Sequence, residues 1–155
     1  MELADILSED CVVVSTDASS KNDVLKTLAE RAAAATGFEA APIFEALSDR
    51  EALGSTGLGN GIAVPHGKFA PLKRVVAVFL KLATPVDFEA VDDHPVDVVM
   101  MLLAPVGAGA DHLKALARVA RILRTDSIVE ALRGTNDPSR LYSILTRPIE
   151  ATKAA

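Results

Sequence analysis

The sequence is poor in several residue types, and each shortage excludes a class of protein. Its 155 residues include one cysteine, three histidines, no tryptophan and only 4% aromatic residues. The single cysteine, Cys11, cannot form an internal disulfide, and with three scattered histidines it gives no structural zinc cluster. So few aromatic rings offer no platform on which nucleic-acid bases could stack. We therefore expect neither a disulfide scaffold nor a metal centre.

An excess of basic charge and long apolar runs are also missing. Acidic residues outnumber basic ones by 21 to 16, so the overall field repels nucleic acid. The longest apolar runs, 75–80 and 98–104, are much shorter than the roughly 20 residues that a membrane helix needs. The acidic start, MELADILSED, lacks the basic flank and apolar stretch of an export signal. We expect a cytoplasmic protein without nucleic-acid binding or membrane insertion.

Hydrophobic residues are abundant, at 50% of the chain, and 24% of residues are charged. This balance is typical of a globular protein, and the length fits one domain spanning residues 1–155. Short apolar and β-branched runs predict strands at 11–15, 74–82 and 96–104, with a shorter strand at 86–90. Strands mixed with helices predict an α/β sandwich of three layers, in which a single mixed β-sheet is flanked by helices on both faces.

Helices are predicted from the spacing of apolar residues and from capping signals. The pattern predicts a helix at 20–36, a second from Pro42 up to Gly54, and a third from His112 to about Leu123 with Asp111 as N-cap. The second should bury Leu53, and the third should turn Leu113, Leu116, Ala117, Ala120 and Leu123 inward. Two shorter helices should open at Asp126 and Pro138, before a frayed tail at 151–155.

The sharpest local signal is a glycine-rich loop that ends in a histidine. Five of the nine glycines lie between residues 54 and 67, and Pro65 and Gly67 flank His66. Proline fixes its own φ and glycine lets the backbone turn away, so His66 should be held stiffly with space around it. A neutral imidazole is nucleophilic at cellular pH, which suits reversible phosphoryl transfer. Equally, the glycines could form ordinary turns around a hydrogen-bonding histidine.

A phosphoryl group on His66 would carry about −1.5 to −2 charges and would need cations and N–H donors nearby. Arg50, Lys68 and the Gly67 backbone are candidates to supply them. Ser55 and Thr56 are treated as supporting residues, because such hydroxyls more often cap turns than act as nucleophiles.

Two further features could complete such a site. His112 follows the predicted N-cap of a helix, where the positive end of the helix dipole favours a neutral imidazole. Such a His112 could donate a hydrogen bond. Leu58 and Phe69 are candidates for the apolar rim of a shallow depression on which a partner protein docks.

Residues 50–67, REALGSTGLGNGIAVPHG, resemble the signature of the fructose/mannitol-type IIA domains of the bacterial phosphotransferase system. The similarity continues through PVD at 95–97, LLAP at 102–105 and His112. The resemblance implies a protein-histidine phosphotransferase component that needs no cofactor. It implies that Nε2 of His66 accepts the phosphoryl group from a histidine-containing phosphocarrier protein, with phosphoenolpyruvate as the ultimate donor. Arg50 and His112 would then stabilise the phosphoryl charge.

The resemblance leaves two branches of the family open. A chain without attached IIB, membrane or carrier domains resembles the nitrogen-regulatory branch, which implies a nitrogen-type phosphocarrier (HPr) as donor and regulatory protein targets. In the alternative, the chain is a fructose- or mannitol-specific relay that passes the phosphoryl group to a IIB component. A hypothesis of another class is an anion-binding module in which His66 forms no covalent bond.

Overall fold

The computed structural model describes residues 2–147, and the tail predicted at 151–155 lies outside them. Within this range the chain forms an α/β fold around one six-stranded sheet. The strands are β1 (Val12–Ser15), β2 (Gly57–Gly59), β3 (Ile62–Ala63), β4 (His66–Lys68), β5 (Val76–Val86) and β6 (Val96–Ala104). The helices are the 3₁₀ turns η1 (Leu3–Asp5) and η2 (Glu9–Cys11), followed by α1 (Lys21–Thr36), α2 (Ala40–Ala52), α3 (Ala110–Leu123), α4 (Asp126–Arg133) and α5 (Pro138–Thr146).

The sheet is mixed, and its strand order is β1-β5-β6-β3-β2, with β4 also paired to β6. β5 and β6 are antiparallel neighbours, β1 runs parallel to β5, and β3 and β4 run parallel to successive parts of β6. Most side chains of β5 and β6 are fully buried, which explains why both strands are nearly continuous apolar runs. β4 is thus held against one side of β6, near its C-terminal end.

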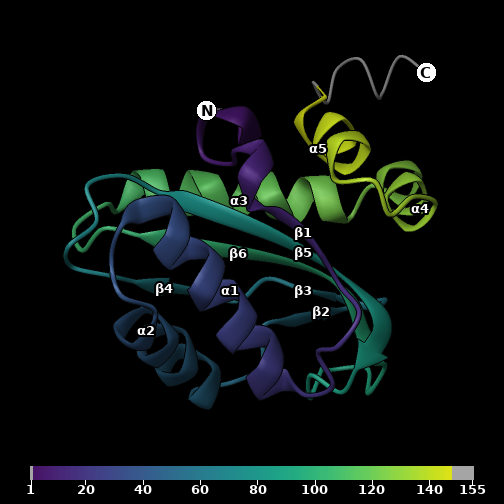
Figure 1. Cartoon of the computed structure of the whole chain (residues 1–155), viewed down its shortest axis with the longest axis horizontal. Coiled ribbons are helices and arrows are strands. Elements are labelled where there is room, and N and C mark those ends of the chain that lie inside the picture. Colours follow the sequence, from purple (N-terminus) through teal and green to yellow (C-terminus); the bar gives the residue numbers. More distant parts are fainter. Residues whose placement is uncertain (1, 148–155) are drawn as a thin grey trace.

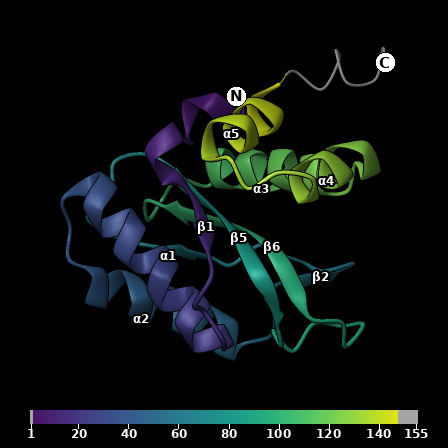
Figure 2. The same ribbon diagram turned by 45° about the vertical axis from the view of Figure 1, so that its right-hand side comes forward.

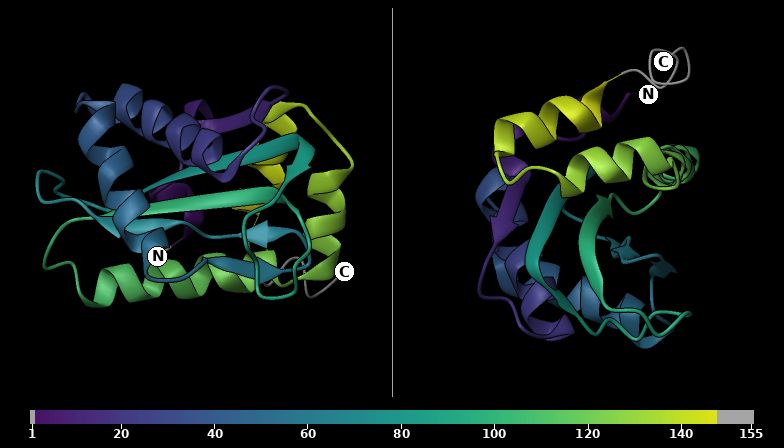
Figure 3. Two further views of the ribbon diagram at one scale, coloured as in Figure 1. Left: turned by 90° about the horizontal axis from the view of Figure 1, so that it is seen from below. Right: turned by 90° about the vertical axis from the view of Figure 1, so that its right-hand side faces the viewer.

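Helices cover both faces of the sheet, so the predicted three-layer sandwich is confirmed (Figure 1). α1 and α2 lie on one face, where α1 contacts β5 and α2 contacts β4. α3 and α5 lie on the other face, against β6 and β1, and α4 packs against both of these helices (Figures 2 and 3). None of the helices described within residues 2–147 is long and apolar enough to cross a membrane.

The first long helix follows its predicted signals. The Ser20 side chain accepts a hydrogen bond from the backbone N–H of Asp23, which caps the start of α1. Gly37 ends the helix in the left-handed conformation, with φ of 83°. The predicted apolar positions of this helix are buried: Val24, Leu25, Leu28, Ala29 and Ala32. The helix at 20–36 is therefore confirmed.

The predicted inward face of α3 is only partly right. Leu123 is buried and Leu116 is partly buried against the core, but Leu113 is 68% exposed. The other buried residues of the helix are His112, Ala115, Val119 and Ile122. In this phase Val119 and Ile122 are buried, while the smaller Ala117 is exposed and Ala120 only partly buried. The helix also begins two residues earlier than predicted, at Ala110, with Gly109 and not Asp111 as its N-cap. This phase turns His112 toward the sheet.

Two further predictions fail near the glycine-rich loop. Only Val86 of the strand predicted at 86–90 belongs to a strand, because the chain then turns: the Asp87 side chain accepts from the N–H of Glu89, which has φ of 55°. Leu53, predicted to be buried, is 84% exposed. The last turn of α2 tightens as Leu53 N donates to the carbonyl oxygen of Arg50, and this turns the leucine outward.

Candidate functional site

His66 is the first residue of the short strand β4, where it lies opposite Leu102 of β6. The strand is tied to β6 at both ends: Leu102 N donates to the carbonyl oxygen of Pro65, and Phe69 N donates to that of Ala104. Its imidazole is half-buried. The structure therefore places His66 on a backbone fixed by the sheet, as the rigid Pro65 predicted.

Gly67 serves a different purpose from the predicted turn. It is a strand residue, and a Cβ atom placed on it would lie 3.2 Å from the carbonyl oxygen of Ala46 in α2. Glycine is thus required by the close approach of α2 and not by a change of chain direction. The Cβ position of Gly67 faces α2, and side chains alternate along a strand, so His66 and Lys68 point away from α2. The His66 ring accordingly lies beside His112 of α3.

Hydrogen bonding fixes which nitrogen of His66 carries the proton. Nδ1 lies 2.9 Å from the carbonyl oxygen of Val64. A carbonyl oxygen can only accept, so Nδ1 is the protonated nitrogen and Nε2 of the neutral ring carries the free lone pair. The nucleophilic nitrogen is therefore the one farther from the backbone.

His112 lies beside His66, as the sequence predicted. Their ring centroids are 5.7 Å apart, with 53° between the ring planes. His112 is only 8% exposed, and its Nδ1 has no hydrogen-bond partner among the described residues. Burial lowers the pKa of His112 below 6.5, and repulsion from Lys68, and from His66 whenever it is protonated, lowers this pKa further. A neutral imidazole thus faces His66.

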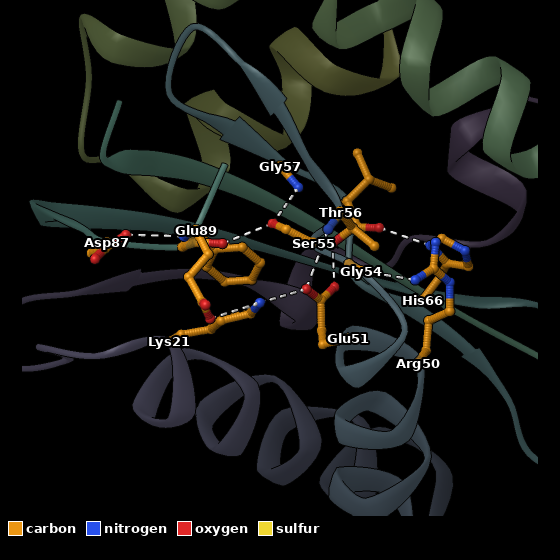
Figure 4. Close-up of polar contacts among 12 residues, drawn as sticks. Lys21, Arg50, Glu51, Gly54, Ser55, Thr56, Gly57, His66, Asp87 and Glu89 are labelled. Atoms are coloured by element: carbon orange, nitrogen blue, oxygen red, sulfur yellow. Dashed lines mark hydrogen bonds and ion pairs between the residues drawn. The ribbon is translucent and has the colours of Figure 1, made fainter. Parts of the chain in front are cut away.

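Arg50 lies in the last turn of α2, and its Nη1 donates to the carbonyl oxygen of Gly54 at 3.0 Å. It lies one helical turn beyond Ala46, the residue of α2 that approaches Gly67 of β4. Figure 4 draws Arg50 and His66 on the same side of the loop that begins at Gly54. The guanidinium is thus anchored at the start of the loop that ends in His66.

Comparison with known proteins decides the family. A family model described as "Phosphoenolpyruvate-dependent sugar phosphotransferase system, EIIA 2" matches residues 5–147. The chain belongs to this family. The resemblance seen in residues 50–67 is therefore confirmed.

Relatives of this EIIA 2 protein include regulatory and sugar-specific members. A "Nitrogen regulatory protein" of Bradyrhizobium diazoefficiens is 45% identical over 148 residues, which cover 96% of this chain and 97% of that protein. The crystal structure of the nitrogen regulatory protein IIA-Ntr from Neisseria meningitidis is 33% identical, with a TM-score of 0.87, covering 93% of this chain and 99% of that one. A "PTS system fructose-specific EIIA component" of Haloferax volcanii is 32% identical over 106 residues, 68% of this chain and 69% of that protein.

In this EIIA 2 protein the hydroxyls of Ser55 and Thr56 have partners away from His66. Ser55 Oγ donates to the carbonyl oxygen of Phe88 at 2.7 Å and accepts from Gly57 N at 3.1 Å. Thr56 Oγ1 donates to the carboxylate of Glu51. Both hydroxyls hold the loop in place. Lys68, by contrast, is exposed, and its charge is close enough to act on His112.

Of the two predicted rim residues, only Leu58 is exposed, and its contact with a partner stays a prediction. Leu58 is 40% exposed, but Phe69 is only 8% exposed and packs edge-on against Phe38, with ring centroids 5.6 Å apart. Phe69 is therefore a core residue, and its predicted place on the rim is wrong. Exposed apolar side chains that the sequence reasoning missed include Leu53, at the end of α2, and Leu113, next to His112. Correct helix phases would have found both.

Acidification is expected to destabilise the fold through His112. Because the folded-state pKa of His112 lies below 6.5, the unfolded chain binds a proton there more readily than the folded protein. The free energy of unfolding should therefore rise with pH between the folded-state pKa and 6.5. This stability is fully present above that window and is lost as the pH falls through the folded-state pKa.

Denaturant unfolding at a series of pH values measures this effect. In His112→Gln the same titration should be flatter across the window, because glutamine takes up no proton there. An equally steep pH dependence in His112→Gln would assign the effect to other groups.

Proposed function

We propose that the chain is a phosphoryl carrier that accepts a phosphoryl group on Nε2 of His66 from a histidine-containing phosphocarrier protein. The observation that carries the proposal is the Nδ1 contact with Val64 O, which leaves the Nε2 lone pair free. A neutral, buried His112 ring lies 5.7 Å from the His66 ring, centroid to centroid. Membership of the EIIA 2 family supports phosphoryl transfer as the chemistry.

The transfer balances without a further reactant. The Nε2 lone pair of His66 forms a bond to phosphorus as the bond between phosphorus and the carrier's histidine nitrogen breaks. The electron pair of the broken bond returns to the carrier's nitrogen. The proton on Nδ1 of His66 stays in place, so the ring gains positive charge, and the Val64 carbonyl oxygen stabilises that charge. Catalysis then consists of positioning and electrostatic stabilisation.

Three side chains would stabilise the transferred group. Arg50 supplies a guanidinium, whose planar N–H groups suit phosphoryl oxygens. Lys68 supplies a second cation on the same strand face as His66. The unpartnered, buried Nδ1 of His112 gains a partner if the ring donates to a phosphoryl oxygen. Ser55, Thr56 and Gly67 contribute by holding the loop and strand that present His66.

Within the family we place the chain in the nitrogen-regulatory branch, with a nitrogen-type phosphocarrier (HPr) as donor. The names of the Bradyrhizobium relative and of the Neisseria structure, which align over more than nine-tenths of this chain, support this branch. In this role the phosphorylation state of His66 controls which proteins bind, because a dianion at the surface reverses local charge complementarity. The Haloferax relative supports the alternative, a sugar relay to a IIB component.

Incubation with phosphorylated phosphocarrier proteins tests the proposal. We expect the intact protein to gain one acid-labile phosphoryl group, seen by mass spectrometry, and the nitrogen-type carrier to be a faster donor than a sugar-type carrier. Absence of any covalent adduct would contradict the proposal and favour the anion-binding module. Rapid onward transfer to a fructose-type IIB protein would favour the sugar relay over the regulator.

A further inference from the structure

The mechanism leaves unused a buried carboxylate next to Arg50. Glu51 is in the last turn of α2, and its side chain is only 4% exposed. Glutamate is almost never buried unless it is paired, because removing a charge from water is costly. A carboxylate held at this position, between the helix that carries Arg50 and the loop that leads to His66, requires a physical explanation.

The Glu51 carboxylate is fully engaged. It accepts from the backbone N–H of Thr56 at 3.2 Å and from the Thr56 hydroxyl, and it forms an ion pair with Lys21 at 3.0 Å. Figure 4 shows all three groups converging on the carboxylate. Thr56 is itself buried. The loop is therefore attached to α2 by two hydrogen bonds to one charged group, which are stronger than bonds between neutral groups.

Lys21 links this attachment to the rest of the fold. It is the first residue of α1, its Nζ lies 4.9 Å from the centre of the Phe88 ring, and it is 3.6 Å from the carboxylate of Glu89. The carbonyl oxygen of Phe88 in turn accepts a hydrogen bond from the Ser55 hydroxyl. The ion pair thus joins α1, α2, the loop and the segment after β5.

From Thr56 a series of contacts leads to the reactive ring. The Thr56 carbonyl oxygen accepts from Val64 N at 3.1 Å. The Val64 carbonyl oxygen then lies 2.9 Å from Nδ1 of His66, the contact that orients the ring and selects its tautomer. One residue, Thr56, therefore lies between the Glu51 carboxylate and the carbonyl group that holds His66.

We propose that Glu51 is a positioning residue for phosphoryl transfer. It fixes the His66 ring through Thr56 and Val64, while Lys21 neutralises the charge of the Glu51 carboxylate. The proposal rests on the proposed function of His66. Glu51 acts through the loop and contacts neither the phosphoryl group nor His66. Since a small misplacement of reacting groups is costly to the rate, a loosened Thr56 should slow transfer even in a folded protein.

The test compares Glu51→Gln and Thr56→Val with the intact protein. Glu51→Gln replaces the charged acceptor by a neutral amide, and Thr56→Val removes the donating hydroxyl, in both cases at nearly constant volume. We expect phosphoryl uptake from a phosphorylated carrier to slow by roughly tenfold to a hundredfold. We also expect the ring-nitrogen NMR signals of His66 to shift or broaden, because the Nδ1–H bond to Val64 is weakened. A merely structural ion pair would change stability and leave this ring signature in place.

Matched variants serve as controls. Thr56→Ser keeps the hydroxyl and should restore uptake and the His66 signals to nearly intact values. Glu45→Gln removes an exposed carboxylate from the same helix and should change neither. If Glu51→Gln fails to fold, the contrast between Thr56→Val and Thr56→Ser carries the same comparison.

The outcomes separate this inference from the function on which it rests. Unchanged uptake together with unchanged His66 signals in folded Glu51→Gln and Thr56→Val would overturn the positioning role while leaving the carrier function intact. If the intact protein takes up no phosphoryl group, the proposed function is wrong. The claim that Glu51 assists phosphoryl transfer is then wrong as well. The ring signals then report only whether Glu51 orients His66.

Discussion

Replacing His66 by alanine is expected to abolish covalent phosphoryl uptake. The substitution removes Nε2, and His112, the imidazole beside it, is buried and set back in the first turn of α3. The fold should persist, because the His66 ring is half-buried and its one hydrogen bond, to Val64 O, stays within the loop. The measurement is the mass gain, and its acid lability, after incubation with a phosphorylated carrier.

His94→Ala is the matched control for this prediction. His94 is an exposed histidine in the turn before β6, with a side chain 70% exposed. Its loss should leave uptake unchanged. If His66→Ala still gained acid-labile phosphate at the normal rate, the phosphoryl acceptor would have to be another residue.

Replacing Arg50 by methionine is expected to give the second largest effect. The rate of phosphoryl uptake should fall on the order of 10²-fold to 10³-fold, because losing one preorganised donor that stabilises the developing charge costs that much in other enzymes. The guanidinium is the cation anchored at the start of the loop, by its bond to Gly54 O. Arg50→Lys should recover only part of the rate, because an ammonium cannot reproduce the planar fork of donors. Single-turnover transfer from the carrier measures these rates.

Arg31→Met separates this role from a general loss of positive charge. Arg31 also donates to a backbone carbonyl oxygen, that of Asp10, from an exposed position on α1. Its replacement should leave the rate unchanged. Equal rates for Arg50→Met and the intact protein would remove Arg50 from the site, whereas an equal loss in Arg31→Met would indicate an effect of net charge on docking.

Much of the fold could be predicted because local signals agreed with the tertiary structure. The helix at 20–36 has a serine cap, a 3.6-residue apolar period and a terminal glycine. Each of these signals depends on residues that are close together in the sequence. The runs that became β5 and β6 are buried on both faces and tolerate little but apolar residues. The strand expected at 86–90 failed because side-chain hydrogen bonds of Asp87 and the turn at Glu89 override the pattern.

The candidate site was predictable in its residues and less so in its geometry. His66, Arg50 and His112 could be singled out from glycine spacing, charge and helix position. Two predicted roles are wrong. Gly67 does not form a turn but leaves space for the close approach of α2, and Phe69 lies in the core against Phe38 and not on an exposed rim. Glu51 could not be found, since a glutamate near the end of a helix is normally exposed, and only the packing of α1 beside α2 gives it Lys21 as a partner.

The sequence by itself determined the layers of the fold, the family and the histidine that ends the glycine-rich loop, because these depend on short-range periodicity and on a contiguous motif. Only the tertiary structure decided which way each side chain faces. His66 and His112 are 46 positions apart in the sequence. They meet because β4 pairs with the C-terminal end of β6 and because α3 buries His112 on the same face as Val119 and Ile122. Such distant contacts follow from the burial of apolar area across the whole chain, which no local pattern encodes.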